Sequence, residues 1–227
     1  MSNNNTSNIL LLLLLFFLGS GAELDDGGEL QTLLTIKRDW GSPAALSSWK
    51  VTSLSFHNFQ IANLIPASIC SLKNLKYLDL SFNNLTGEFP TALYSCSALQ
   101  FLDLSNNEFT GKLPEHVDKL SLGMQHLNLS SNSFIGDLPS AIGRFSKLKS
   151  LKLEMLFLSG NNFIGEIGSD ISALKLQELD LSINKLTGSI PEDIVSNNNL
   201  SDMSKLANLV RLDLSRNQLS GLIPTSC

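Results

Sequence analysis

The sequence contains few cysteines, few tyrosines or tryptophans and an excess of negative charge. Only three cysteines, two tyrosines and two tryptophans occur among 227 residues. Lysine and arginine together number 16, against 21 aspartates and glutamates, so the formal net charge is −5. A negative long-range field repels nucleic acid and anionic lipid headgroups. We therefore expect no nucleic-acid partner, and a basic or neutral partner fits better.

Long apolar runs are also missing, apart from one near the N-terminus. Residues Ile9 to Leu18 read ILLLLLLFFL, which is about half of the ~20 residues that a membrane-spanning helix needs. Ser20 and Ala22 then occupy the −3 and −1 positions of a cleavage site before Glu23, as in a secretory signal peptide. The segment before the run carries no lysine or arginine. The sequence thus predicts a signal peptide over residues 1–22, a secreted mature chain and no membrane span within it.

Motifs for catalysis, metals or cofactors are missing as well. His57, His116 and His126 are scattered, and the cysteine spacing fits no zinc site. The glycines recur at long intervals instead of clustering in a phosphate-binding loop. We therefore expect no enzymatic activity, no metal and no cofactor.

The three cysteines do not reveal their own pairing. Cys70, Cys96 and Cys227 enter an oxidising export route, so at least one thiol is unpaired or joined to another chain. Cys70 and Cys96 lie about one repeat apart. A bridge between neighbouring coils is one pairing that this spacing allows.

What the sequence has in abundance is an internal repeat. The segment from Leu75 reads LKYLDLSFNNLTGEFP, and that from Leu99 reads LQFLDLSNNEFTGKLP. Further copies of the template begin at Met124, Leu153, Leu176 and Leu209. Repetition at a period of 20 to 30 residues indicates a solenoid of stacked coils.

Each position of the template has a physical role. The L-x-L pair points two leucines inward from one short strand. The asparagine that follows has a donor and an acceptor on a short stem, so it can bond backbone groups of adjacent coils. A later glycine permits positive φ and the following proline fixes an extended return path. The expected ladder asparagines are Asn83, Asn107, Asn132, Asn161, Asn184 and Asn217.

The repeat is irregular in two places. Successive ladder asparagines are separated by 24, 25, 29, 23 and 33 residues. The interval of 29 holds two strand signatures, LKSLKL and LEMLFL, which predict either one bulged coil or two fused coils. The interval of 33 contains VSNNNLSD, from Val195 to Asp202, at a distance that completes no coil. The first copy carries Phe59 at the ladder position and Asn63 at the glycine position.

The L-x-G-x-I-P half of the template resembles the plant-specific class of leucine-rich repeats, over about Leu54 to Pro224. The segment NLKYLDLSFNNLTGEFPTAL looks closest to the sequences of ectodomains of HAESA-like receptor-like kinases. The resemblance implies an α/β solenoid: a right-handed superhelix with a parallel concave sheet and a 3-10 or irregular convex side. It would comprise residues 51–227 in about six or seven coils without a C-terminal cap. Relatives of this kind are anchored in the plasma membrane and face the extracellular space, the apoplast.

Residues 23–50 look like part of the N-terminal cap of this family. Leu30, Leu33, Leu34 and Trp40 have helical spacing. The C-x-W-x-G-V-x-C stretch that normally follows is missing, because the chain runs from Trp49 directly into VTSLSF. We expect a partial cap that contains a helix.

The resemblance also identifies candidate binding residues, because side chains beside the inward leucines face the concave surface as columns. The first column contains Tyr77, Phe101, His126, Met155, Glu178 and Arg211. The second contains Asp79, Asp103, Asn128, Phe157, Asp180 and Asp213. A third, expected to be exposed, contains Ser81, Ser105, Ser130, Ser159, Ser182 and Ser215. Aromatic side chains give large contact areas at low entropic cost, and the acidic column would attract a basic peptide.

From these columns we expect nine residues to bind a partner; the alternative is that they are ordinary variable positions. They are Tyr77, Asp79, Phe101, Asp103, His126, Glu178, Asp180, Arg211 and Asp213. The recurrence of Asp and Ser in every copy indicates that these two also serve the coil. N-x-S/T sequons predict glycosylation at Asn84, Asn128 and Asn199.

The sequence therefore favours an extracellular recognition module that binds a peptide or a partner receptor through its concave or lateral face, with a co-receptor as a further candidate partner. One alternative is a secreted inhibitor of a microbial cell-wall-degrading enzyme, similar to polygalacturonase inhibitors. Another is a truncated gene product without a function.

Overall fold

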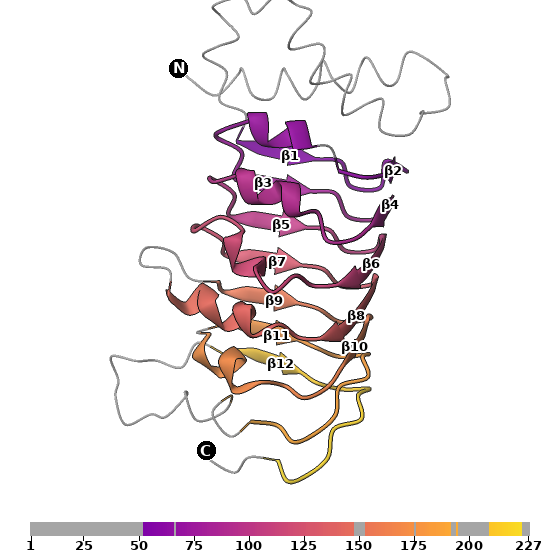
Figure 1. The fold of residues 1–227 in the computed structure, drawn as a ribbon, viewed down its shortest axis with the longest axis vertical. Helices are drawn as coiled ribbons and strands as arrows, with labels where there is room; N and C mark the ends of the chain where they lie inside the picture. Colours follow the sequence, from indigo (N-terminus) through magenta and orange to yellow (C-terminus); the bar gives the residue numbers. More distant parts are fainter. Residues whose placement is uncertain are drawn as a thin grey trace, which may run out of the picture.

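The computed structural model describes residues 52–65, 67–147, 153–174, 176–191, 194 and 209–223. These residues form a solenoid in which each turn of the chain stacks on the one before (Figure 1). The expected signal peptide, the partial cap, Asn199 and the VSNNNLSD segment lie outside the described residues.

One side of the solenoid is a seven-stranded sheet to which each described coil contributes one strand. All neighbouring strands are parallel, and they lie in the sheet in chain order. The strands are β1 (Ser53–Ser55), β3 (Tyr77–Asp79), β5 (Phe101–Asp103), β7 (His126–Asn128), β9 (Met155–Phe157), β11 (Glu178–Asp180) and β12 (Arg211–Asp213). The register does not slip, so equivalent residues of successive coils are direct neighbours.

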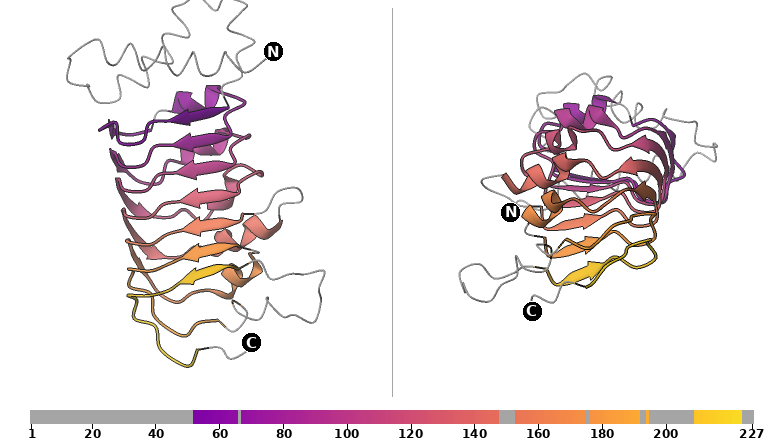
Figure 2. Two further views of the ribbon diagram at one scale, coloured as in Figure 1. Left: turned by 180° about the vertical axis from the view of Figure 1, so that it is seen from behind. Right: turned by 60° about the horizontal axis from the view of Figure 1, so that its bottom comes forward.

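A second parallel sheet forms where each coil turns away from the first (Figure 2). It contains β2 (Ala62–Asn63), β4 (Asn84–Gly87), β6 (Glu108–Lys112), β8 (Ser133–Asp137) and β10 (Asn162–Ile164). We call it the lateral sheet. Its turns need the template glycines: Gly111 and Gly136 have φ of 76° and 82°, values that favour glycine.

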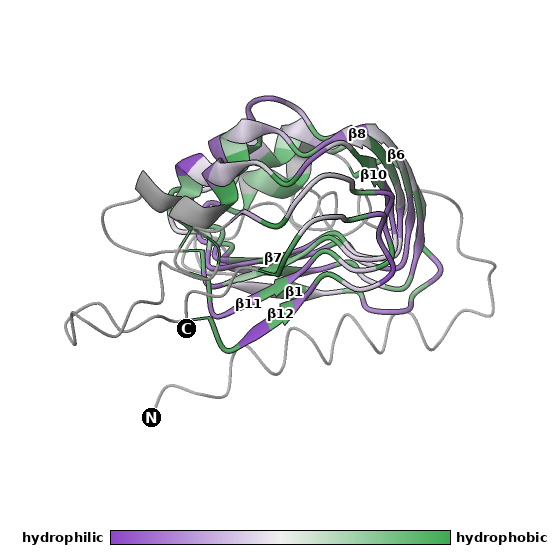
Figure 3. Ribbon diagram, turned by 90° about the horizontal axis from the view of Figure 1, so that it is seen from below, coloured by the Kyte–Doolittle hydropathy of each residue, from purple (hydrophilic) through white to green (hydrophobic). Residues whose placement is uncertain are grey.

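Short 3-10 helices complete the coils on the side opposite the seven-stranded sheet (Figure 3). They are η1 (Ala67–Ser71), η2 (Thr91–Ser95), η3 (Val117–Lys119), η4 (Ser140–Lys147) and η5 (Ser169–Ala173). The expected α/β solenoid, with a parallel sheet on one side and 3-10 segments on the other, is confirmed.

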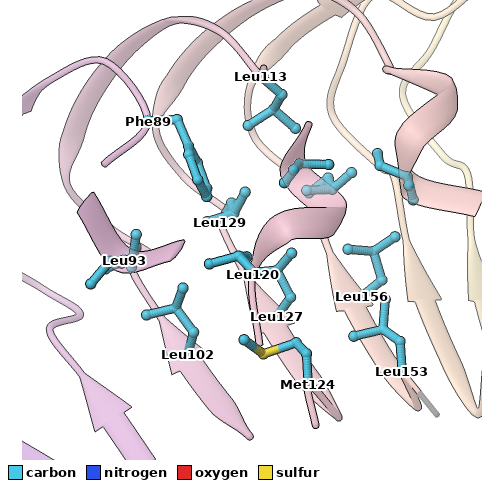
Figure 4. Close-up of a cluster of buried hydrophobic side chains, with 14 of the residues drawn as sticks. Phe89, Leu93, Leu102, Leu113, Leu120, Met124, Leu127, Leu129, Leu153 and Leu156 are labelled. Carbon is cyan, nitrogen blue, oxygen red and sulfur yellow. The ribbon is translucent and has the colours of Figure 1, made fainter. Parts of the chain in front are cut away.

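The core consists of apolar side chains that each coil places at the same positions (Figure 4). Leu102 of β5, Leu127 of β7 and Leu156 of β9 are at most 1% exposed and lie against Leu93 and other residues of the helical side. Burying one such side chain contributes about 1.5–3 kcal/mol. A coil without these apolar side chains would therefore lose most of the free energy that favours its stacking on the neighbouring coils.

The asparagines bind two coils together. The Nδ2 of Asn132 donates to the carbonyl oxygen of Leu104 in the preceding coil at 3.0 Å, and to that of Leu129 in its own coil at 3.1 Å. Its Oδ1 accepts from the backbone N–H of Phe109 at 3.1 Å. Such bonds satisfy backbone groups that burial would otherwise leave without partners. The same pattern recurs at Asn83, Asn107, Asn161, Asn184 and Asn217.

The residue before each ladder asparagine has a left-handed backbone conformation, which the sequence did not predict. These residues are Phe82, Asn106, Ser131, Gly160, Ile183 and Arg216, with φ between 52° and 64°. Such values are uncommon outside glycine and are outliers for a β-branched residue such as Ile183. The left-handed residue turns the chain out of the strand so that the asparagine can point inward.

The irregular intervals do not interrupt the sheet. Strand β7 pairs directly with β9 across the interval of 29 residues, and β11 pairs directly with β12 across the interval of 33. The first of these coils contains η4, which with eight residues is the longest of the described 3-10 helices. Most of the LKSLKL signature lies outside the described residues, so the choice between one bulged coil and two fused coils stays open.

The pairing that the sequence left open is settled for two cysteines. Cys70 and Cys96 form a disulfide with a Cα–Cα distance of 4.6 Å. Both are buried, at 2% and 3% exposure. Cys70 lies in η1 and Cys96 directly follows η2, so the bond joins neighbouring coils.

Candidate recognition surface

The nine residues expected to bind a partner all lie on the seven-stranded sheet, on the face opposite its inward leucines. The register places Tyr77 beside Phe101, Phe101 beside His126, and His126 beside Met155. The same row continues through Glu178 and Arg211. Side chains of equal position therefore form continuous rows across the coils, as the alternation of a strand requires.

Three rings in this row are stacked face to face. The ring centroids of Tyr77 and Phe101 are 4.1 Å apart with planes 14° from parallel, and those of Phe101 and His126 are 4.1 Å apart at 8°. We call Tyr77, Phe101 and His126 the aromatic row. Pairs of aromatic rings contribute about 0.5–1.5 kcal/mol beyond their buried area. The row is therefore ordered before any partner binds, and it exposes ring edges because the ring faces cover one another.

Two residues that we did not count among the binding residues extend the aromatic row. The ring of Phe157 lies 5.4 Å from that of His126, and the Sδ atom of Met155 lies 3.3 Å from the His126 Nδ1. Both positions were visible in the columns, but an isolated apolar residue beside an L-x-L pair carries no signal of contact. Their contacts with His126 become apparent only when adjacent strands are placed side by side in the structure.

The surroundings keep the aromatic row uncharged. Burial lowers the pKa of His126 below its ordinary value, although Asp103, Glu178 and Asp79 act in the opposite direction. Burial and the carboxylates of Asp79 and Asp103 raise the pKa of the Tyr77 hydroxyl. At neutral pH the surface therefore combines neutral rings with a negative field.

The second row contains carboxylates whose orientation is fixed by the turn after each strand. The Oδ1 of Asp79 accepts from the backbone N–H of Ser81 at 3.0 Å and from its hydroxyl at 2.6 Å. We call Asp79, Asp103, Asp180 and Asp213 the carboxylate row; all four accept from the serine two residues later. The hydrogen bonds from Ser215 lower the pKa of Asp213. One oxygen of each carboxylate is thus held by the coil.

The expectation that the serines form an exposed column was wrong for three of them. Ser81, Ser105 and Ser182 are buried, at 3%, 3% and 5% exposure. Each strand of the sheet has only three residues, and the chain turns inward before the serine. The alternation of the strand therefore does not extend to the third column.

The C-terminal half of the surface is charged instead of aromatic. Glu178 and Arg211 form an ion pair of 3.9 Å between β11 and β12, with both side chains partly exposed. Exposed pairs of this kind contribute about 0–1 kcal/mol. This pair therefore shapes the charge of the surface more than it stabilises the fold.

The sequons differ in their accessibility. Asn84 is exposed on β4 of the lateral sheet, where its Nδ2 donates to the Glu108 Oε1 at 3.3 Å. Asn128 lies within the seven-stranded sheet, and its Nδ2 donates to the Asp103 Oδ2 at 2.9 Å. A glycan on Asn128 would have to replace that bond. Glycosylation stays a prediction at both sites.

Two features are missing from the described part of the chain. No group of three histidine, cysteine, aspartate or glutamate side chains there is arranged to hold a metal ion. None of the helices described is both long enough and apolar enough to cross a bilayer.

Comparison with known proteins identifies the family. Sequence models described as leucine-rich repeat match residues 50–109, and again residues 123–145, 152–174, 175–197 and 208–227. The chain belongs to the leucine-rich-repeat family. No sequence among curated proteins matches this leucine-rich-repeat chain significantly.

Solved structures that resemble this leucine-rich-repeat protein include several plant receptors and also a plant ice-binding protein. A TDR receptor has a TM-score of 0.65 at 36% identity, over 76% of this chain and 27% of its own. The Arabidopsis receptor kinase HAESA, in complex with the peptide hormone IDA and the co-receptor SERK1, has 0.60 at 32% identity, over 73% and 25%. A pollen receptor kinase 3 has 0.64 at 26% identity, over 92% and 95%. The chain thus spans about a quarter of the TDR and HAESA ectodomains.

Proposed function

We propose that this leucine-rich-repeat protein is an extracellular recognition module that binds a peptide, or a partner receptor, through the exposed face of its seven-stranded sheet. The observation that carries this proposal is the aromatic row, in which Tyr77, Phe101 and His126 are stacked at 4.1 Å. A few anchor residues supply most of the binding energy in many protein interfaces, and aromatic residues such as tyrosine and phenylalanine are enriched there.

The position of the aromatic row outside the core indicates a role in binding a partner more than a role in stabilising the fold. These rings lie outside the core, because the inward positions of the same strands are filled by Leu78, Leu102 and Leu127. The coil needs no ring there, since the equivalent residues of β1 and β12 are Ser53 and Arg211. Aromatic residues that the fold does not require are therefore available to a partner.

The carboxylate row suggests which peptides are favoured. Carboxylates that the coil already orients lose little entropy when they accept a further hydrogen bond from a ligand, and their negative charge speeds encounter with a basic partner. The similar HAESA structure contains a peptide hormone and a co-receptor, which supports the same classes of partner here.

Selection from a displayed library of random peptides tests this proposal. The bait is the full secreted chain, and the comparison is a Phe101→Ala/His126→Ala variant. We expect selected peptides to bind the wild-type chain and to bind this variant at least about tenfold more weakly, since truncating two central anchors costs ~2 kcal/mol or more.

The matched control is a Thr110→Ala/Lys112→Ala variant. Both residues are exposed on β6 of the lateral sheet, so the selected peptides should bind it as they bind the wild-type chain. Equal weakening by both variants, or failure to select any peptide, would contradict the proposed surface.

A further inference from the structure

The aromatic row ends abruptly at its N-terminal side. One face of the Tyr77 ring is covered by Phe101 at 4.1 Å. On the other side the register places Ser53 of β1 beside Tyr77. Ser53 is exposed, and its side chain is a single hydroxymethyl group. Where β5 and β7 each add a ring to the row, β1 therefore adds almost nothing.

Among the described residues, β1 leaves the position beside Tyr77 without a large side chain, and the spacing of the row suits a planar group there. Adjacent strands lie about 4.8 Å apart, and the rings of the aromatic row are spaced at 4.1 Å. A flat group that lay above Ser53 would continue the row as its next member. His57 of the first coil does not fill this position, because its ring lies against Phe82 at 4.9 Å and its Nδ1 contacts the Ser81 hydroxyl at 2.8 Å.

A carboxylate lies beside this position. Asp79 is two residues after Tyr77 on the same face of β3, about 7 Å further along the strand. Its Oδ1 is held by Ser81, and its Oδ2 accepts from the Ser55 hydroxyl at 3.3 Å. The Asp103 carboxylate follows on β5. Neither aspartate forms an ion pair with a described lysine or arginine.

We propose that Ser53, Ser55, Tyr77 and Asp79 form a subsite for the guanidinium group of an arginine in the bound peptide. The guanidinium would stack on the open face of Tyr77 and donate to the Asp79 carboxylate. This inference rests on the proposed function, because the subsite is one end of the same surface. It specifies the chemistry of one side chain of the ligand and the place on the surface where that side chain binds.

Arginine fits these two features better than other side chains. Its guanidinium is planar, carries a permanent charge, stacks on aromatic faces and offers a fork of donors to a carboxylate. A lysine ammonium has the charge but lacks the plane. A phenylalanine ring has the plane but leaves the carboxylate unpaired. The raised pKa of Tyr77, caused by burial and by Asp79 and Asp103, agrees with a negative potential at this ring.

The chain offers a favourable probe, because it has only two tyrosines. Tyr94 lies on η2, in the helical layer on the opposite side of the solenoid. Tyrosine-labelled full chain would be titrated with acetyl-Gly-Arg-Gly-amide and followed by NMR of the tyrosine rings. We expect the Tyr77 ring signals to shift and those of Tyr94 to stay in place.

Two further tripeptides separate charge from shape. Citrulline in place of arginine keeps the planar group and removes the charge, while lysine keeps the charge and removes the plane. We expect both to bind at least about fivefold more weakly than the arginine peptide, because each loses one of the two interactions. Equal affinity for arginine and citrulline would overturn the subsite.

Substitutions in the protein provide the converse test. Ser53→Phe would place the protein's own ring in the open position, and Asp79→Asn would remove the charge. Both have precedents in the chain: Phe101 occupies the same row as Ser53, and Asn128 keeps the turn of the second row by accepting from Ser130 at 3.1 Å. The variants should therefore fold, which a thermal melt verifies.

We expect Ser53→Phe and Asp79→Asn each to weaken binding of the arginine peptide at least about tenfold, while the Thr110→Ala/Lys112→Ala variant of the lateral sheet binds it as the wild-type chain does. Undiminished binding to Ser53→Phe would overturn the subsite. Peptides selected from the library separate this failure from that of the proposed function: if they bind Ser53→Phe normally but depend on Phe101 and His126, the recognition surface stands and the arginine subsite is wrong. If no peptide is selected and the tripeptide shifts no Tyr77 signal, both proposals fail.

Discussion

The rings of Phe101 and His126 lie 4.1 Å apart with their planes 8° from parallel. This contact links two coils through their outer faces, in addition to the leucines that link them inside. The imidazole is enclosed further by Phe157 and by the Met155 sulfur, and its buried Nε2 has no hydrogen-bond partner among the described residues. A titratable group thus sits at the centre of the proposed binding surface.

The enclosure of His126 predicts that stability depends on pH. Burial lowers its pKa in the folded chain, whereas the unfolded chain has the ordinary value of about 6.5. The unfolded state therefore takes up a proton first as the pH falls. The neutral imidazole costs nothing above about pH 6.5, and the folded state loses stability as the pH falls from there towards the lowered pKa.

A His126→Phe variant isolates this effect, because Phe101 shows that the row accepts phenylalanine. Urea unfolding at about pH 7.5 and pH 5 should show a larger loss of unfolding free energy for the wild-type chain than for the variant. His57 and His116 are present in both proteins, so their contributions cancel. The same loss in both proteins would mean that the imidazole is not kept neutral by its neighbours.

The asparagine ladder predicts that the stability lost on removing one asparagine depends on its position along the solenoid. Asn132 is 9% exposed and bonds groups of two coils, so Asn132→Ala leaves buried backbone groups without partners. We expect it to lower the unfolding free energy by roughly 3 kcal/mol. Asn217 makes equivalent bonds in the last described coil, where it is only partly buried.

Because water can replace the amide of Asn217, we expect Asn217→Ala to cost about 1 kcal/mol or less. Chemical denaturation of both variants measures the difference. Equal losses would show that the ladder stabilises each coil by itself and does not depend on burial between two coils.

The parts of the fold that repeat by residue type could be predicted from the sequence. Leucines, asparagines and glycines each recur because one position has one physical requirement. The left-handed residue before the asparagine could not be predicted, because Phe82, Ile183 and Arg216 share a conformation without sharing any chemistry. The strand context and the ladder bonds impose that conformation regardless of side chain.

The candidate site was predictable to the same extent. The equivalent positions of the repeat template predicted that Tyr77, Phe101 and His126 lie in one row, and the strand register of the structure has the same order. That their faces cover one another depends on side-chain rotamers, which the sequence does not specify. The burial of Ser81 and Ser105 depends on where a three-residue strand ends, and alternation alone cannot locate that end.

Ile183 predicts a stabilising substitution. Its φ of 53° places a β-branched residue in the left-handed region, and its side chain is 48% exposed. Ile183→Asn introduces the residue that the chain itself uses at the equivalent Asn106, which has the same φ of 53°. Relief of this strain should raise the unfolding free energy by about 1 kcal/mol in urea denaturation.

Ile164→Asn is the matched control, because Ile164 is equally exposed at 47% but lies in strand β10. Asparagine is unfavourable in strands, so this variant should gain no stability and lose a little. A gain of the same size in both variants would attribute the effect to the removal of exposed apolar surface instead of backbone strain.

The disulfide predicts a link between covalent structure and the recognition surface. Cys70 and Cys96 lie in the segments that lead into β3 and β5, the strands that carry Tyr77 and Phe101. A cross-link over 26 residues restricts the conformations of the unfolded chain and so stabilises the folded state by about 3–4 kcal/mol in the entropic model.

The Cys70→Ala/Cys96→Ala variant should therefore have an unfolding free energy lower by about this amount when it is measured in urea without reductant. The wild-type chain should show a similar loss when it is unfolded in the presence of reductant. If the folded double variant also gives altered Tyr77 ring signals in NMR, the bond helps to hold β3 and β5 in the arrangement that stacks the rings. Unchanged stability of the wild-type chain in reductant would contradict the stabilising role of the bond.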